Sequence, residues 1–217
     1  MVKTQIATLQ FITQDHPTLS HAEQIKQAME GGVRWVQLRM KDASDAAIEQ
    51  EATEALKWTR RYNGILIIDD NPYIVAKVGA DGVHLGKKDI APNEARKIIG
   101  SDKIIGGTAN TFNDINFLRL QEVDYIGLGP FRYTTTKKHL SPLLGLEGYQ
   151  TILQQLKKEG IMAPIVAIGG IKENDLVHLF ATGLHGVAIS GTIAMSENIA
   201  KTAQEFVNQV NILAKEV

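Results

Sequence analysis

The sequence predicts a (β/α)8 barrel, the TIM-barrel fold class, and three observations support this prediction. Eight short apolar segments alternate with longer segments in which apolar residues recur every three or four positions. The chain has 217 residues, a length that such barrels use as one domain. Two segments, Gly79–Val83 and Gly183–Val187, repeat one pattern in which a glycine suits the end of a helix and a valine begins a strand. We therefore expect residues 1–217 to form one barrel domain, with an open doubly wound sheet as the structural alternative.

The apolar segments consist largely of β-branched and aliphatic residues, as expected for parallel strands buried on both faces. In chain order they are Leu9–Thr13, Trp35–Arg39, Ile65–Asp70, Gly82–Leu85, Lys103–Thr108, Tyr125–Gly129, Pro164–Gly170 and Gly186–Gly191. Eight such segments match the strand number of a closed α/β barrel.

The segments between these strands have the periodicity of amphipathic helices. It is clearest in two places, Tyr149–Leu156 and Ile199–Leu213, where apolar residues fall three and four positions apart. Ser44, Asn93 and Asn113 precede helical segments and are expected to be N-caps.

Composition excludes several classes of protein. The formal net charge is −1, which gives no reason to expect attraction to nucleic acid or to an anionic membrane. The chain has no cysteine, so disulfides and thiolate catalysis are excluded. Residues 1–11 lack the apolar run typical of a signal peptide, and no apolar stretch reaches membrane-spanning length. We expect a cytoplasmic protein that acts on small molecules, and assembly into a homo-oligomer stays open.

Charged residues collect where the predicted strands end. Alternation along the second strand places Gln37, Arg39 and Lys41 on one side. Cations that face the mouth of a barrel are costly unless they meet an anion. They therefore indicate an anionic ligand, although a carboxylate from a neighbouring strand could also pair with Arg39.

The third strand ends in Asp69 and Asp70, and Asp89 follows the fourth strand. Neighbouring strand ends would bring Asp70 and Asp89 together, and two carboxylates with open positions suit Mg²⁺ beside a phosphate. The alternative is that these aspartates only cap a helix or form a turn.

The long connection from Gly129 to Glu147 follows the sixth strand, on the face where barrel enzymes have their active sites. Thr134, Thr136 and Lys137 could hold a phosphate there, although a solvated basic loop is the alternative.

Glycine residues mark the ends of the last two strands. Gly169 and Gly170 follow the seventh strand, and Ile189 and Ser190 precede Gly191 at the end of the eighth. Loops after strands seven and eight form the usual phosphate site of this fold. His84, inside the fourth strand, is expected to be a hydrogen-bonded strand histidine, and no histidine has metal-binding spacing.

These segments together resemble the thiamine phosphate synthase family. The resemblance rests on VQLRMK, IIDD, VGADGVHLGKKD, GGTAN, YIGLGPF with TTTKK, VAIGGI and GVAISGT, which occur in the family's order from the second strand to the eighth. It implies an enzyme that joins 4-amino-5-hydroxymethyl-2-methylpyrimidine diphosphate to a thiazole phosphate and releases thiamine phosphate and pyrophosphate.

The resemblance also implies residue roles. It assigns the pyrimidine diphosphate to Gln37, Arg39, Lys41, Asp69, Thr108 and Lys137, Mg²⁺ to Asp70 and Asp89, and the thiazole phosphate to Thr134, Thr136, Gly169, Gly170, Ile189 and Ser190. Arg39, Lys41 and Lys137 are implied to stabilise the departing pyrophosphate.

Two departures from the family's usual residues stand out. Asp69 replaces the usual Asn and Lys87 the usual Gln, so we hypothesise that the Lys87 cation approaches the Asp69 carboxylate and offsets its charge. The alternative is two independent substitutions, with Lys87 solvated. Two rival functions remain: a related thiazole tautomerase, and a non-catalytic regulator that binds thiamine phosphates. The charged residues of a complete diphosphate site favour the synthase over both.

Overall fold

The computed structural model describes residues 6–133 and 142–215. Its parallel strands are β1 (Leu9–Ile12), β2 (Trp35–Leu38), β3 (Ile65–Asp69), β4 (Gly82–Leu85), β5 (Ile104–Ala109), β6 (Tyr125–Leu128), β7 (Ile165–Ala167) and β8 (Gly186–Ile189). Each strand pairs with the next, and β8 pairs with β1 through Leu9 and Val187, so the sheet closes. The predicted (β/α)8 barrel is confirmed, and the open-sheet alternative is wrong.

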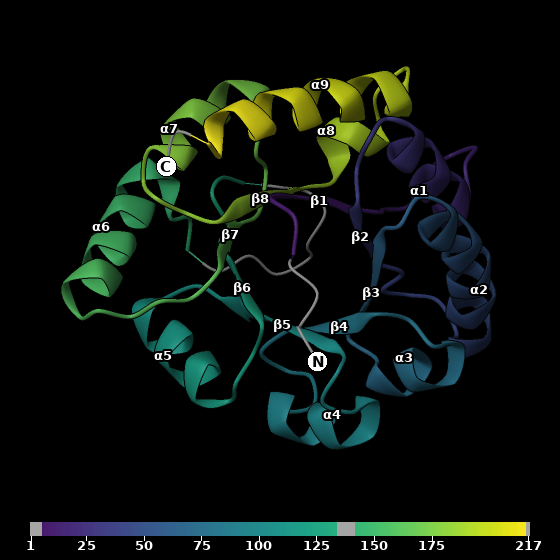
Figure 1. Cartoon of the computed structure of the whole chain (residues 1–217), viewed down its shortest axis with the longest axis horizontal. Helices are drawn as coiled ribbons and strands as arrows, with labels where there is room; N and C mark the ends of the chain where they lie inside the picture. Colours follow the sequence, from purple (N-terminus) through teal and green to yellow (C-terminus); the bar gives the residue numbers. More distant parts are fainter. Residues whose placement is uncertain (1–5, 134–141, 216–217) are drawn as a thin grey trace.

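Helices surround the barrel (Figure 1). They are α1 (His21–Glu30), α2 (Asp45–Arg61), α3 (Pro72–Val78), α4 (Pro92–Ile99), α5 (Phe112–Leu120), α6 (Gly145–Lys158), α7 (Leu176–Phe180), α8 (Gly191–Ala194) and α9 (Ile199–Leu213), with a 3₁₀ turn at Glu173–Asp175. In the described ranges, no helix is long and apolar enough to cross a membrane.

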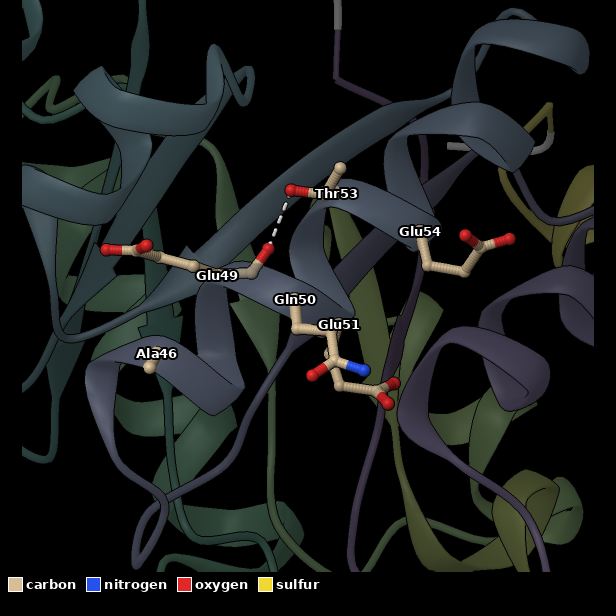
Figure 2. A pocket seen from close by; sticks show the side chains of 6 residues that line it. All are labelled: Ala46, Glu49, Gln50, Glu51, Thr53 and Glu54. Carbon is tan, nitrogen blue, oxygen red and sulfur yellow. Dashed lines mark hydrogen bonds between the residues drawn. The ribbon is translucent and has the colours of Figure 1, made fainter.

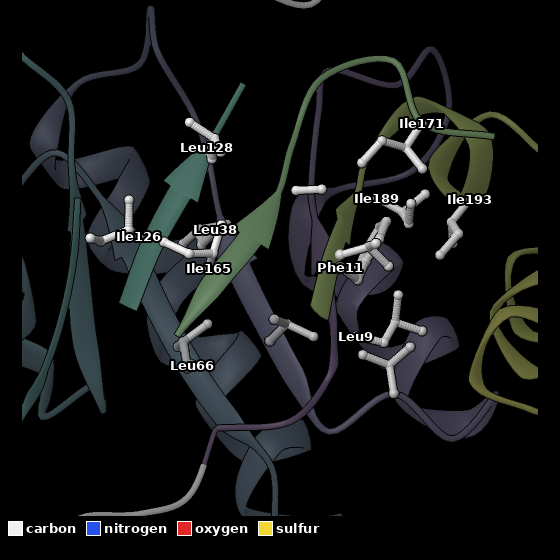
Figure 3. Close-up of a cluster of buried hydrophobic side chains, with 14 of the residues drawn as sticks. Leu9, Phe11, Leu38, Leu66, Ile126, Leu128, Ile165, Ile171, Ile189 and Ile193 are labelled. Carbon is white, nitrogen blue, oxygen red and sulfur yellow. The ribbon is translucent and has the colours of Figure 1, made fainter. Parts of the chain in front are cut away.

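Alternation along the strands divides the core into two parts. Outward-facing residues such as Phe11, Leu38 and Leu66 pack under the helices (Figure 3). A smaller cluster fills the barrel and contains Trp35, Ile65, Ile67, Ile104, Tyr125, Val166 and Ala188. Because Trp35 and Ile67 face inward, Gln37 and Asp69, two positions further along their strands, face the barrel mouth.

Two of the three expected N-caps are wrong. Ser44 caps α2 by accepting a hydrogen bond from Ala47 N–H, as predicted. Asn93 lies inside α4, because Pro92, which has no N–H to satisfy, occupies the first helical position after Ala91. Asn113 lies inside α5, because Thr111, two residues earlier, is the N-cap and forms a capping box with Asp114.

Several strands are shorter than the apolar segments that predicted them. The seventh was expected over Pro164–Gly170, but β7 ends at Ala167, and Gly169 and Gly170 have φ angles of 93° and 71°. Those angles are incompatible with a strand. Gly79, in contrast, ends α3 in the left-handed conformation (φ 75°) that the sequence predicted.

Candidate active site

The polar end of β2 converges on one carboxylate at the end of β3. Gln37 donates a hydrogen bond of 2.7 Å to Asp69 Oδ1, and Lys41 Nζ lies 3.0 Å from Asp69 Oδ2. Arg39 Nε lies 3.5 Å from the same oxygen. The structure therefore brings together Gln37, Arg39 and Lys41 as predicted, and it also gives Arg39 the neighbouring-strand carboxylate that was the alternative explanation.

Asp69 is almost completely buried beneath these cations. Its side chain is 8% exposed, whereas that of Lys41 is 42% exposed, so the cations separate the carboxylate from solvent. Burial, and then the nearby Asp70 charge, raise the pKa of Asp69, and the Lys41 and Arg39 cations oppose that rise only in part. The free site thus contains positive groups whose anionic partner comes from the protein itself.

Asp70 and Asp89 form the second charged feature. Asp70 has a left-handed backbone (φ 65°), which is unusual for a residue with a side chain and is found at functional sites. Its carboxylate contacts both Lys41 Nζ and the Asp89 carboxyl group.

The environment of Asp89 follows from that contact. Burial, and then the Asp70 carboxyl group, raise the pKa of Asp89 to about 6, although a 2.6 Å hydrogen bond from Gly86 N–H opposes the rise. Two carboxyl groups in contact repel one another when both are ionised, and a divalent cation would relieve that repulsion. The donor set at Asp70 and Asp89 therefore fits Mg²⁺.

Lys87 does not lie against Asp69, and the hypothesis that one charge offsets the other through direct approach is wrong. Lys87 Nζ pairs instead with Asp114 Oδ2 at 2.6 Å. That oxygen also accepts hydrogen bonds from the backbone N–H groups of Asn110 and Thr111 at the start of α5. Lys87 thus joins the loop after β4 to the first turn of α5.

Thr108, near the end of β5, has its hydroxyl 2.9 Å from His84 Nε2. His84 Nδ1 lies 2.9 Å from the Tyr125 hydroxyl, so both ring nitrogens have partners. The prediction that His84 is a hydrogen-bonded strand histidine is confirmed.

The loops after β7 and β8 form the glycine-containing side of the mouth. A side chain at Gly169 would bring Cβ to 2.7 Å from Pro130 Cβ, so glycine allows the segment after β6 to pack closely there. Arg132 donates a 2.9 Å hydrogen bond to the Gly170 carbonyl. Ile189 is buried at the end of β8, and the Ser190 hydroxyl follows it in the loop.

Sequence reasoning missed several residues that support these groups. Gln14 follows β1, and its side-chain carbonyl accepts a 3.2 Å hydrogen bond from the Ser190 hydroxyl. Thr13 Oγ1 accepts a 3.0 Å hydrogen bond from the Arg39 backbone and lies 2.8 Å from His21 Nδ1. Their position just after a strand end was the available signal, but polar residues are common there.

Three predicted site residues, Thr134, Thr136 and Lys137, lie outside the described residues. Their flanks are placed: Arg132 forms a two-point ion pair with Asp175, with N–O distances of 2.5 and 2.8 Å. This pair ties the segment after β6 to the turn after β7.

A shallow hollow on the outer surface of α2 has no part in this site (Figure 2). Its acidic side chains already have partners: Glu49 pairs with Lys77, Glu54 with Lys57, and Glu51 accepts a hydrogen bond from Ala22 N–H. The hollow therefore does not compete with the barrel mouth as a candidate.

The chain forms a closed parallel barrel, and its ionisable groups gather beyond the carboxyl ends of the strands. These two features define the class of (β/α)8-barrel enzymes. The thiamine monophosphate synthase family model matches residues 9–193. The chain belongs to this family and is a transferase.

Individual relatives agree along nearly the whole chain. A thiamine-phosphate synthase from Phocaeicola vulgatus is 48% identical over 200 residues, covering 92% of this chain and 96% of the relative. One from Bacteroides fragilis is 46% identical, with 93% and 98% covered. The solved structure of a thiamine phosphate pyrophosphorylase from Pyrococcus furiosus superposes with a TM-score of 0.83 at 28% identity, covering 95% of this chain and 96% of that one.

Proposed function

We propose that this enzyme condenses 4-amino-5-hydroxymethyl-2-methylpyrimidine diphosphate with a thiazole phosphate, giving thiamine phosphate and pyrophosphate. The observation that carries the proposal is the convergence of Arg39 and Lys41 beside the paired carboxyl groups of Asp70 and Asp89. Cations next to a divalent-metal donor set match the chemistry of a diphosphate group.

The diphosphate would bind at the ends of β2 and β3. Arg39 and Lys41 would exchange part of their contact with Asp69 for phosphate oxygens, and Lys137 would approach from the loop after β6. Gln37 and Thr108 would orient the pyrimidine ring. Asp70 and Asp89 would hold Mg²⁺, which when bound would neutralise charge on the phosphate oxygens.

The thiazole phosphate would bind on the opposite side of the mouth. Gly169, Gly170, Ile189 and Ser190 would surround its phosphate, with Thr134 and Thr136 from the loop after β6. This places the two substrates on facing sides of one opening, as a condensation requires.

The reaction would proceed by loss of the leaving group first. The bond between the pyrimidine methylene carbon and the diphosphate oxygen breaks, and pyrophosphate leaves with the electron pair. The thiazole nitrogen then donates its lone pair to the methylene carbon. Arg39, Lys41 and Lys137 stabilise the charge that grows on pyrophosphate, and no general base is needed, because no proton is removed.

The direct test is to incubate the protein with both substrates and Mg²⁺ and to measure thiamine phosphate and pyrophosphate by mass spectrometry. We expect both products in equal amounts, and neither when one substrate is left out. Isomerisation of a thiazole carboxylate without the pyrimidine would indicate the tautomerase instead. Binding of thiamine phosphates without turnover would indicate the regulator.

Metal removal gives the first testable prediction. EDTA should abolish product formation and excess Mg²⁺ should restore it, because without the metal the Asp70 and Asp89 carboxylates would repel the diphosphate anion. Asp70→Ala and Asp89→Ala should each lower kcat/KM by roughly 100-fold or more. Asp102→Asn, at an exposed carboxylate before β5, is the matched control and should be fully active. Full activity in EDTA would remove the metal from the proposal.

A further inference from the structure

Four polar side chains from four strands form a continuous chain of contacts inside the barrel. Gln10 Nε2 on β1 donates a 3.3 Å hydrogen bond to the Tyr125 hydroxyl on β6. Tyr125 Oη lies 2.9 Å from His84 Nδ1 on β4, and His84 Nε2 lies 2.9 Å from Thr108 Oγ1 on β5. Gln10 and Tyr125 are 1% exposed and His84 is 8% exposed, so only the Thr108 end reaches the barrel mouth.

The barrel is shaped around the two rings of this chain. A Cβ at Gly106 would overlap the Tyr125 ring, and a Cβ at Gly127 would lie 3.1 Å from His84 Cε1. Trp35 packs edge-on against Tyr125 with the ring centroids 4.8 Å apart. Both rings are therefore held in place by packing, so the polar contacts between them depend little on side-chain motion.

The contacts have a direction. The Tyr125 oxygen accepts from Gln10, and burial raises the pKa of Tyr125, so the phenol keeps its hydrogen. That hydrogen can be donated only to His84 Nδ1, since an N–H at Nδ1 would leave a buried hydroxyl hydrogen without an acceptor. Neutral His84 then carries its proton on Nε2 and donates it to Thr108 Oγ1.

We propose that Gln10, Tyr125 and His84 are positioning residues that make the Thr108 hydroxyl a hydrogen-bond donor towards the pyrimidine substrate. Because Thr108 Oγ1 already accepts from His84, its own hydrogen points to an acceptor atom in the mouth. The acceptor is of the kind that a pyrimidine ring nitrogen or a phosphate oxygen supplies. We call the hydrogen bonds that run from Gln10 through Tyr125 and His84 to Thr108 the relay. The inference rests on the proposed function for the identity of the substrate, but not for the direction of the relay.

The direction is tested in the free protein by ¹⁵N NMR of the histidine side chains at about pH 8, where an ordinary histidine is neutral. The chain has six histidines, and loss of one signal set in His84→Gln assigns His84. We expect the Nε2–H tautomer, with Nδ1 as the unprotonated acceptor. A protonated Nδ1 would overturn the relay.

Tyr125→Phe removes the hydroxyl that donates to His84 Nδ1. His84 should then lose its preference for the Nε2–H tautomer. Tyr149→Phe is the matched control: Tyr149 is an equally buried tyrosine whose hydroxyl bonds the Leu128 carbonyl outside the relay. It should leave the His84 signals unchanged, and it reports the cost in stability of removing a buried phenol. Identical His84 spectra in Tyr125→Phe and wild type would contradict the relay.

Kinetics test what the relay does. Tyr125→Phe should lower kcat/KM for the pyrimidine diphosphate by about 5- to 10-fold and leave KM for the thiazole phosphate unchanged. Thr108→Val removes the hydroxyl, and adding Tyr125→Phe to it should cause no further loss, whereas Thr108→Ser should retain activity. If Tyr125→Phe lowered kcat/KM by the same factor in wild type and in Thr108→Val, Tyr125 would not act through Thr108.

Failure of the two proposals can be told apart. If wild-type protein makes no thiamine phosphate, the proposed function is wrong, while the ¹⁵N spectra still decide the direction of the relay. If the enzyme is active but His84 carries its proton on Nδ1, the relay alone is wrong.

Discussion

Asp69 is the residue on which the candidate site is centred, because it satisfies three side chains that an anionic substrate would otherwise satisfy. Gln37 needs only a hydrogen-bond acceptor there, but Arg39 and Lys41 are cations that pair with the Asp69 carboxyl group. An incoming diphosphate must therefore compete with the protein's own carboxylate for these cations.

Asp69→Asn should lower KM for the pyrimidine diphosphate by about 5-fold or more, because the amide keeps the Gln37 contact and removes the competing charge. Lys87→Gln should change that KM little, since Lys87 pairs with Asp114. The double variant should show the sum of the two effects within about 0.5 kcal/mol, as expected for residues without a shared partner. A larger coupling would show that the two charges communicate.

Asp175 provides a pH-dependent contribution to stability. Burial alone would raise its pKa, but the Arg132 guanidinium and the Lys172 N–H together hold that pKa below its ordinary value. A carboxyl group with a depressed folded-state pKa stabilises the fold above the unfolded-state pKa of about 3.9, and this contribution is lost as pH falls through the folded-state pKa.

The prediction is measured as a difference in the free energy of unfolding between wild type and Asp175→Asn. At pH 7 the variant should be less stable by about 1–2 kcal/mol, a value reduced because Arg132 is partly exposed. The difference should shrink below about pH 4. A difference that is constant from pH 7 to pH 3 would show that the ion pair contributes nothing.

At the scale of single elements, the helix starts explain why local sequence signals succeeded in one place and failed in others. Both helix starts contain several residues that can cap a helix: Asp42, Ser44 and Asp45 at α2, and Thr111, Asn113 and Asp114 at α5. Residue type alone therefore does not decide which of them is the cap. In α5 the capping box decides, because Thr111 and Asp114 each satisfy a backbone N–H of the other.

Thr111→Ala should therefore destabilise the protein by about 1 kcal/mol, because α5 loses its side-chain cap. Asn113→Ala is the matched control, two residues away and exposed inside the helix, and should change stability by less than about 0.5 kcal/mol. Urea unfolding of both variants measures the two effects. A larger loss of stability in Asn113→Ala than in Thr111→Ala would indicate that Asn113 is the cap.

At the scale of the whole molecule, the two ends of the barrel carry different ionic groups. At the mouth, carboxylates face one another or substrate-facing cations. At the opposite end, Asp124 precedes β6, accepts a 2.8 Å hydrogen bond from Ile105 N–H and pairs with Arg96 at 2.9 Å. The ionic groups at the mouth are placed to bind a charged ligand, whereas those at the opposite end join a strand to its neighbouring helix.

Asp124→Ala should lower the free energy of unfolding by about 2–4 kcal/mol, because the Ile105 N–H loses its acceptor and Arg96 loses its carboxylate partner, keeping only its backbone acceptors Gly100 and Lys103. At a temperature where the variant is folded, kcat should stay within about 2-fold of wild type, since Asp124 lies at the far end of the barrel from the substrates. Denaturant unfolding and steady-state kinetics on the same sample measure both. A fall in kcat without a loss of stability would contradict this division between the two ends.

The fold class and the strand ends where ionisable groups gather follow from local sequence patterns alone. Apolar segments of strand length, alternating with amphipathic helices, are local patterns, and strand polarity then places every residue that follows a strand at the same end of the barrel. Gln37, Arg39, Lys41, Asp70 and Asp89 could be predicted together for that reason.

Which of these groups are in contact depends on how the closed barrel packs. Closure of the sheet brings Tyr125 on β6 against His84 on β4, and it directs Lys87 to Asp114 and away from Asp69. Such contacts join residues distant in the chain and depend on the radius of the barrel and on the two glycines that admit the rings. Local sequence patterns carry no information about these distances, because pairing across a barrel is set by packing.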